Sequence, residues 1–578
     1  MNEASVGCTQ ALDADACSAR AAWAGMQMAC GPALRRTFPL AVDGHLPFVP
    51  PARDQSTASA ARIRLELARA RHMLVRLDAA EALVVLQRVE RQIALVPGQD
   101  VLALFSEVAA MRAASLVLQD DVTAALAAAL SALRLHAHSP AAHVARSVCR
   151  YVYWHLGDMT QLEAPTSGET GEYPDRLRAA TAVFDCSVDA MTELRQLHLN
   201  SAQALAEHAL NMAQYIGDVS PSIDVLPASI IGQVLFERGR LEEAHALIAP
   251  RLPHLRRAGM VEGVLRCYSL LARIAAARGQ TGHALALLIE AEELAIKSRW
   301  PRLRAASLAQ QVAIHLGMGS AAEATGCARR LEAQIAACVP QGGMPSFEMA
   351  RYLAITQARL ALARPSGTFG VQQLQNVYRD CVSRHDYISA VEVALLLVEM
   401  QLQQQRQDEA FELLATLMLY AVAAGLLQTF VDCGDSVGEL IEKLGRGEMP
   451  LPLTDAHSLR AYASLIDARR KRARHLSQPC GGVDANSNAH RGLSAATGLS
   501  NRERVIVGLM GQGMTNKQIA MHLRIAPETV KSHAKHLYTK LSVKNRAEAV
   551  TVAARLELPR FSEKEAADRV TRAHVGSL

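Results

Sequence analysis

Aromatic side chains are scarce in this sequence, at 4% of 578 residues, whereas half of the residues are apolar and a fifth are charged. A protein built mainly of β-sheets needs Val, Ile, Tyr and Phe, so this Ala- and Leu-rich composition argues against one. The 11 cysteines are scattered singly, with no Cys-x-x-Cys pair and no tight Cys/His cluster. Neither a disulfide framework nor a zinc site is indicated. The composition favours an all-α chain long enough for several domains.

The sequence has little that would direct it to a membrane. Acidic residues precede the first arginine and no uninterrupted apolar segment lies near the N-terminus, so we expect no secretory signal. The uncharged stretch from Leu413 to Val431 has the 19 residues of a membrane span. It contains Gly425, which suits a helix end, and acidic residues flank it in place of Lys or Arg anchors. We therefore expect a cytoplasmic protein without membrane contact.

Positive charge is concentrated near the C-terminus. The net charge of the whole chain is +5, but residues 460–578 carry +12 and residues 1–459 carry −7. Such asymmetry indicates that the C-terminal part binds a polyanion. The run Arg469-Arg470-Lys471-Arg472 has two interpretations, a solvated helix end or a contact with phosphate.

A repeat of about 40 residues occupies the chain from residue 59 to residue 445. Three windows align without gaps, Gly239 to Ala244, Gly279 to Ala284 and Gly319 to Ala324, at steps of 40 residues. An apolar helical run ends near each Gly and another follows it, so each unit predicts one helical hairpin. Gly would supply the left-handed residue that ends the first helix, and the small Ala would let the second helix pack closely. In other units, the same phase assigns the position of this small residue to Ala82, Ala124, Ala164, Ala204 and Ala410.

These units resemble lengthened tetratricopeptide (TPR) repeats. Such arrays form a superhelix with an extended inner docking surface, so the resemblance implies a sensor or interaction domain over residues 59–445. A plain spacer is the alternative. We leave residues 1–58 unassigned and expect them to be loosely ordered. Residues 446–476 would form a basic helical connector, residues 477–498 a flexible linker and residues 559–578 a polar tail.

Residues 499–558 predict four short helices. Ser500 with Glu503, and Thr515 with Gln518, have the spacing of capping boxes, and Pro527 suits the first position of a third helix. A tight turn between the second and third helices is typical of a helix-turn-helix unit. On a helical wheel of the third helix, Val530, Ala534, Leu537 and Leu541 form one apolar stripe.

Lys531, Ser532 and Lys535 lie on the face of the third helix opposite that stripe. A helix of this size fits the major groove of DNA, where lysine donates to guanine. A merely solvated basic face is the alternative.

The same residues resemble the LuxR/FixJ-type DNA-binding domain. The matching residues, in order, are Leu499-Ser500, Arg502-Glu503, Gly513, Asn516-Lys517, Ile519-Ala520, Thr529-Val530-Lys531, His533, Lys540-Leu541, Arg546 and Ala549-Val550. The resemblance implies that Lys531, Ser532 and Lys535 face bases. It places near phosphates Thr515, Asn516, Lys517, Thr529, His533 and Lys540. It also implies that the fourth helix pairs two domains on DNA, through Arg546, Ala549, Val550 and Ala553.

A second resemblance concerns the end of the repeats. The stretch Gly425-Leu-Leu-Gln-Thr-Phe-Val-Asp-Cys-Gly434 looks like the end of the repeat domain in MalT-type regulators. Members of that group usually begin with a nucleotide-binding domain, yet no Gly-x-x-x-x-Gly-Lys-Ser/Thr motif occurs in this sequence. We therefore expect no ATP-driven switching, no cofactor and no enzymatic activity. A metal site at His136, His138 and His143 is disfavoured, because no acidic partner is placed to orient them.

Together these features predict an all-α transcriptional regulator with a TPR-like superhelix and a C-terminal four-helix LuxR-type helix-turn-helix domain. The expected partners are double-stranded DNA, RNA polymerase, a second copy of the chain on DNA, and an unknown effector or protein on the repeats. Activation is what the family suggests. The alternative function is an interaction scaffold whose C-terminal domain binds DNA weakly and without sequence preference.

Overall fold

The computed structural model describes residues 53–94, 101–138, 141–162, 176–215, 222–256, 259–338, 346–364, 370–449, 456–477 and 514–523, with single residues between 506 and 549. The described residues contain helices and no strands, which confirms the predicted all-α class. Chain contacts divide the protein into Met1–Arg62 and Ile63–Leu578. Within the first unit the described residues 53–62 are helical, so the loosely ordered segment expected over residues 1–58 is wrong for residues 53–58.

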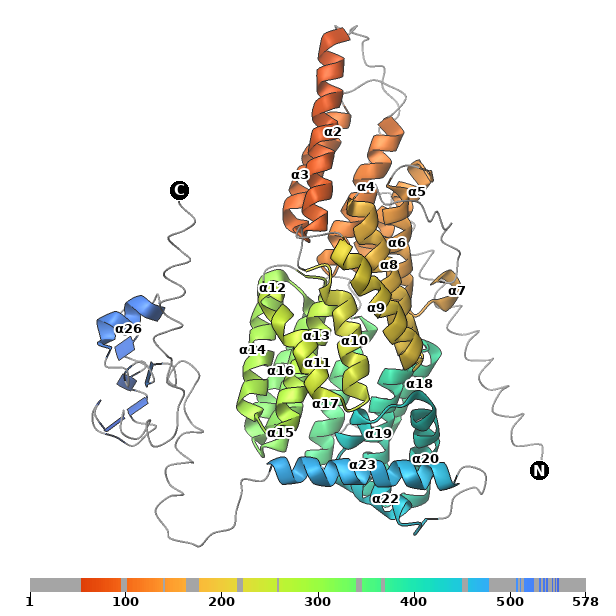
Figure 1. Ribbon diagram of the computed structural model, residues 1–578, viewed down its shortest axis with the longest axis vertical. Helices are drawn as coiled ribbons and strands as arrows, with labels where there is room; N and C mark the ends of the chain where they lie inside the picture. The colour runs from red at the N-terminus through yellow and green to blue at the C-terminus, as the bar shows by residue number, and fades with distance from the viewer. Residues whose placement is uncertain are drawn as a thin grey trace, which may run out of the picture. The chain divides into compact units, whose positions relative to one another are not determined.

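Helical hairpins follow one another along the chain (Figure 1). The first half contains α2 (Arg53–Val75), α3 (Ala79–Ile93), α4 (Val101–Leu118), α5 (Val122–Leu135), α6 (Ala142–Leu156), α7 (Met159–Leu162), α8 (Arg176–Arg195), α9 (Leu199–Tyr215), α10 (Val225–Glu237), α11 (Leu241–Ile248) and α12 (Leu252–Leu255). The second half contains α13 (Val261–Ala277), α14 (Thr281–Ser298), α15 (Pro301–Gly317), α16 (Ala321–Cys338), α17 (Phe347–Ala363), α18 (Val371–Ser383), α19 (Tyr387–Gln403), α20 (Gln407–Ala424), α21 (Gln428–Val431) and α22 (Asp435–Gly445). Helices α23 (Ala456–Ser477) and α26 (Asn516–Leu523) complete the described set.

The hairpin turns share one backbone conformation. Gly239, Gly279 and Gly319 have φ of 72°, 73° and 71°, which confirms the predicted left-handed residue at the end of the first helix. Other hairpins place residues with side chains in the same conformation, including Leu77 and Asp120, with φ of 62° and 65°. The conformation is therefore a property of the hairpin, and glycine is only the least strained residue for it.

A small buried residue lies five positions after each of these turn residues. Ala82, Ala244, Ala284, Ala324 and Ala410 are all fully buried, as the repeat phase predicted. The repeat phase predicted the wrong buried residue in two units, because the turns of those units do not follow a constant step of 40 residues. After Asp120 the buried position is Ala125 and not Ala124, and after Leu197 it is Ala202 and not the exposed Ala204. Ala164 lies outside the described residues.

Distant hairpins are joined where helices end. The last carbonyl oxygens of α4, α6 and α10 accept hydrogen bonds from groups far along the chain. Trp300 Nε1 donates to Leu118 O over 3.0 Å, Arg384 Nη1 to Leu156 O over 2.6 Å, and Leu427 N to Glu237 O over 2.7 Å. Helix C-termini leave carbonyl groups without partners inside the helix, so these contacts satisfy them while fixing one repeat against another.

The stretch from Leu413 to Val431 is not one continuous helix. Helix α20 ends at Ala424, and its C-cap Gly425 has φ of 73°. By length and apolar composition alone, α4 could cross a membrane, and half of its residues are buried inside the protein. It packs against α3, α5 and α6, as a core helix does.

Candidate functional site

The helix-turn-helix region contains the capping box expected at its second helix. The Thr515 N–H donates to Gln518 Oε1 over 2.8 Å, and the Gln518 N–H donates to Thr515 Oγ1 over 3.4 Å. These two bonds satisfy backbone donors that α26 cannot pair internally, so the predicted start of this helix is confirmed.

The apolar back of the third helix is also confirmed. Val530, Ala534 and Leu537 are 4% exposed or less, as the predicted stripe requires. Val530 and Ala534 pack in one cluster with Ile506, Met510, Ile519 and Ala520. Leu541 lies outside the described residues. The stripe therefore joins the third helix to α26 and to the residues before it.

The described basic residues of this region lie on its surface. Lys517, Lys531 and Lys535 are exposed, while Asn516 is half-buried. This placement leaves the three ammonium groups accessible to a polyanion. The other predicted contacts, Ser532, Thr529, His533 and Lys540, lie outside the described residues.

Arg546 has a contact that sequence reasoning missed. Its guanidinium donates to the carbonyl oxygens of Met510, over 3.2 Å, and Met514, and it lies 3.5 Å from Asn516 Oδ1. Arg546 therefore holds the start of α26 in place, and Ala549 is fully buried. These two residues, expected on a pairing helix, are engaged within the domain. The other two, Val550 and Ala553, lie outside the described residues.

The repeats contain a cavity of about 900 Å³ that sequence reasoning did not locate. Helices from both halves of the array line it, including α6, α8, α10, α13, α15, α17 and α19. Among the described side chains of its wall, three buried polar atoms have no hydrogen-bond partner: Trp154 Nε1, Arg351 Nε and Gln310 Oε1. Unpaired buried donors and acceptors of this kind are destabilising.

A buried network centred on Arg302 lies beside this cavity. Arg302 Nε donates to Asp120 Oδ1 over 2.6 Å, and Nη1 donates to Glu348 Oε2 over 3.1 Å and to Glu262 Oε1. Its Nη2 donates to the Tyr151 hydroxyl over 3.0 Å. These contacts tie the turn between α4 and α5 to α6, α13, α15 and α17, and Arg302 itself is 2% exposed.

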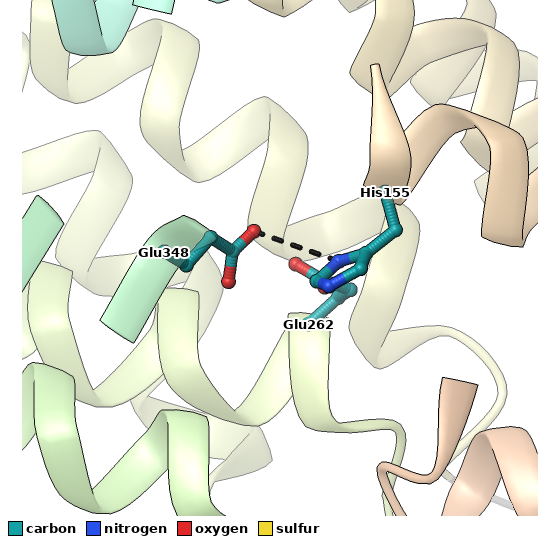
Figure 2. Close-up of side chains that lie close together, drawn as sticks. All are labelled: His155, Glu262 and Glu348. Atoms are coloured by element: carbon teal, nitrogen blue, oxygen red, sulfur yellow. Dashed lines mark ion pairs between the residues drawn. The ribbon is translucent and has the colours of Figure 1, made fainter. Parts of the chain in front are cut away.

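Three members of this network have the composition of a metal site. Figure 2 shows His155, Glu262 and Glu348, whose potential ligand atoms lie within 4.8 Å of one another. Arg302 Nη1 already contacts all three, at 3.3 Å from His155 Nδ1. Burial and the charge of Arg302 lower the pKa of His155 to about 4, so the imidazole is neutral at pH 7 and accepts a hydrogen bond. The guanidinium thus supplies the positive charge that these carboxylates require.

The histidines considered from the sequence are placed differently. His136 and His138 are exposed and His143 is half-buried, and none belongs to the cluster in Figure 2. The sequence gives little indication that His155, Glu262 and Glu348 lie together, because they belong to α6, α13 and α17, which are far apart in the chain.

One member of the basic run in α23 is buried, and the other three are exposed. Arg470 is 6% exposed, and its Nη1 donates to the carbonyl oxygens of Val431, over 2.8 Å, and Cys433, over 2.6 Å. Lys471 Nζ donates to Glu442 Oε1 over 2.9 Å. Arg470 is therefore neither a solvated side chain nor a phosphate contact, whereas Lys471 is exposed. Both contacts hold α23 against the end of the repeats, where Figure 1 shows it crossing beside α20 and α22.

Comparison with known proteins agrees with this architecture. Residues 106–446 match the family model of the MalT-like TPR region, and residues 497–553 match that of bacterial regulatory proteins of the luxR family. The fold and the C-terminal unit define a helix-turn-helix transcription regulator. More particularly, the chain belongs to the family with a MalT-like TPR region, because that match covers more than half of its residues.

Similar proteins include regulators named HTH-type transcriptional regulator MalT. The Vibrio campbellii protein is 31% identical over 166 residues, which are 28% of this chain and 18% of the relative. The Vibrio cholerae protein is 26% identical over 336 residues, which are 57% of this chain and 35% of the relative. This chain thus spans about a third or less of their length. A solved Rap protein, complexed with competence and sporulation factor, has a TM-score of 0.46 at 14% identity and covers 63% of this chain and 99% of its own.

Proposed function

We propose that this chain is a sequence-specific DNA-binding activator of transcription in the cytoplasm, whose repeats bind an effector. The observation that carries the proposal is the third helix of the C-terminal unit. Its Val530, Ala534 and Leu537 are buried, while Lys531 and Lys535 are exposed. A helix fixed on its apolar side leaves its opposite side for the major groove, where lysine donates to guanine O6 and N7.

The proposed contacts with DNA divide into two kinds. Lys531, Ser532 and Lys535 would contact base edges and so choose the sequence. Thr515, Asn516, Lys517, Thr529, His533 and Lys540 would contact phosphates and fix the orientation. Two copies paired through Val550 and Ala553 would place their recognition helices about one turn of DNA apart, and RNA polymerase would be the partner of the bound pair.

The cavity between the repeats is the proposed effector site. Its wall contains charged side chains such as Arg195, Glu237 and Asp386, which favour a polar ligand over an apolar one. A volume of about 900 Å³ lies within the range of pockets that bury small molecules, so the effector is a small molecule or a short peptide.

The contacts of α23 supply a route from the cavity to the C-terminal unit. Thr429, Asp432, Cys433 and Gly434 line the cavity. Arg470 of α23 binds the carbonyl oxygens of Cys433 and Gly434 in the same segment. A ligand that moves this segment would therefore shift α23, which precedes the linker to the helix-turn-helix unit.

The proposal is tested by footprinting the purified full chain on DNA selected from a random library. We expect a protected site with two-fold sequence symmetry. Binding without sequence preference would contradict the regulator and favour the interaction scaffold. The proposal assigns no reaction to the chain, so ATP hydrolysis by the purified protein would contradict that part of it.

A further inference from the structure

The charges that line the cavity are almost all neutralised by one another. Each pair joins a guanidinium to a carboxylate at 4.0 Å or less, so the wall presents little net charge of its own. The pairs are Arg195 with Glu348, Arg273 with Glu237 and Asp432, Arg351 with Asp386, Arg359 with Glu392, and Glu262 with Arg302.

Arg266 on α13 is an exception among the described residues of the wall. Its guanidinium donates to Gln233 Oε1 over 2.8 Å and to Ser229 Oγ over 3.4 Å, both neutral groups on α10. Within the described parts of the chain, no carboxylate lies within ion-pair distance of it. Burial lowers its pKa, and the carboxylate of Glu262, one helical turn earlier on α13, acts in the opposite direction.

Glu399 on α19 is the opposite exception. No Lys or Arg side chain described in the structure lies within ion-pair distance of its carboxylate. The carboxylate packs against Gly434, where an added Cβ would collide with it. Burial raises its pKa, and the positive charge of Arg359 opposes that rise. Among its described residues, the cavity wall thus holds one cation and one anion that form no direct ion pair.

We propose that the cavity binds a small zwitterion, with its carboxylate on Arg266 and its ammonium group on Glu399. The inference rests on the proposed effector site and names the chemistry of its ligand. A polyanion would have to break existing ion pairs to gain more than one cation, whereas a neutral sugar would leave both charges uncompensated. An amino acid or a short peptide with free termini carries both groups and fits the volume.

A guanidinium binds a carboxylate with two parallel hydrogen bonds, so Arg266 would fix the orientation of the ligand.

The test is calorimetric titration of the full chain with the 20 standard amino acids and with unblocked alanine peptides of about two to four residues, a length the cavity admits. We expect saturable binding of at least one probe, and a loss of affinity of about tenfold or more when both ends of that peptide, or the amino and carboxyl groups of that amino acid, are blocked. Equal binding of the blocked form, or no binding by any probe, would overturn the proposal.

Variants of the two residues locate the site. Arg266→Gln and Glu399→Gln should each weaken binding about tenfold or more, whereas Arg266→Lys should retain more affinity than Arg266→Gln. Arg278→Gln is the matched control, because Arg278 follows the same helix and pairs with Glu242 outside the cavity wall. Unchanged affinity in Arg266→Gln would refute the assignment.

Folding and DNA binding separate the possible failures. Arg266→Gln removes hydrogen bonds to Gln233 and Ser229 but breaks no ion pair of the described residues, so its melting temperature should stay well above the temperature of the titration. A footprint with no zwitterion binding would leave the regulator in place and overturn the ligand class. Zwitterion binding without any sequence-specific footprint would overturn the regulator and leave the ligand site in place. Binding of trehalose, a neutral disaccharide, with unchanged affinity in Arg266→Gln would keep an effector cavity and reject the zwitterion.

Discussion

Arg302 and Asp120 are 182 positions apart in the chain, yet Arg302 Nε donates to Asp120 Oδ1 over 2.6 Å in the interior of the array. Their side chains are 3% and 1% exposed. The contact fixes the turn between α4 and α5 against α15, and it makes the repeats more than a series of neighbouring hairpins.

Removing Arg302 should destabilise the array strongly. Arg302→Ala leaves the carboxylates of Asp120 and Glu262 buried without their cation and removes one of the two arginines that pair with Glu348, which costs about 3–5 kcal/mol in comparable cases. Urea unfolding of the full chain measures the change. The control is Arg240→Ala, which breaks an exposed pair with Glu243 and should leave the midpoint unchanged. Equal effects of the two variants would contradict the role of the network.

The neutral His155 predicts how stability changes in acid. Its pKa is about 4 in the folded chain and about 6.5 when unfolded, so between these values the unfolded chain binds more protons. His155 therefore contributes stability that is present above pH 6.5 and is lost as the pH falls to about 4. The loss is about 3 kcal/mol for this shift.

The variant His155→Asn isolates that contribution. Its amide oxygen can accept from Arg302 in place of Nδ1 and does not titrate in this range. We expect the stability difference between the two proteins to change by about 3 kcal/mol in favour of the variant between pH 7 and pH 4. A difference that is constant with pH in urea titrations would contradict the neutral imidazole.

Ala284 tests the packing of the hairpins. It is fully buried five residues after the turn residue Gly279, and Ala284→Leu should destabilise the array by about 1–3 kcal/mol through overpacking. The exposed neighbour His283 provides the control, since His283→Leu adds a similar group outside the helix interface. Thermal unfolding that shows equal shifts for both would argue against this packing.

The two kinds of lysine in the C-terminal unit should respond differently to substitution. Lys535→Ala should weaken binding to the preferred DNA by about 1–3 kcal/mol and relax the choice of base. Lys517→Ala should weaken binding to all sequences similarly and reduce the salt dependence by about one unit of slope. Binding isotherms at several salt concentrations measure both effects. Equal losses on every sequence for the two variants would refute the assigned contacts.

The local features of this fold were predictable from the sequence because their causes are local. The capping box of Thr515 and Gln518 depends on residues three apart, and Val530, Ala534 and Leu537 share one face at helical spacing. The repeat phase held after Gly239, Gly279 and Gly319, and also at Ala82 and Ala410, whose turn residues are Leu77 and Gln405. It failed at Ala124 and Ala204, because the turn residues Asp120 and Leu197 lie out of that phase and no glycine marks them.

The cavity and its network could not be predicted in the same way. Arg302 contacts residues from four other segments, and the sequence does not indicate which arginine pairs with these residues. The same holds for Arg470, whose neighbours in the basic run suggested solvent or phosphate, although its guanidinium is buried against backbone carbonyl groups. Pairings of this kind depend on how distant repeats stack.

Cross-linking from the recognition helix to DNA tests the central claim most directly. A photoreactive amino acid at Ser532 in the full chain, bound to its selected DNA, should cross-link to a base within the protected site. The same group placed at the exposed His283 in the repeats should give no such product. Absence of a DNA cross-link from position 532 while the site stays protected would contradict the account.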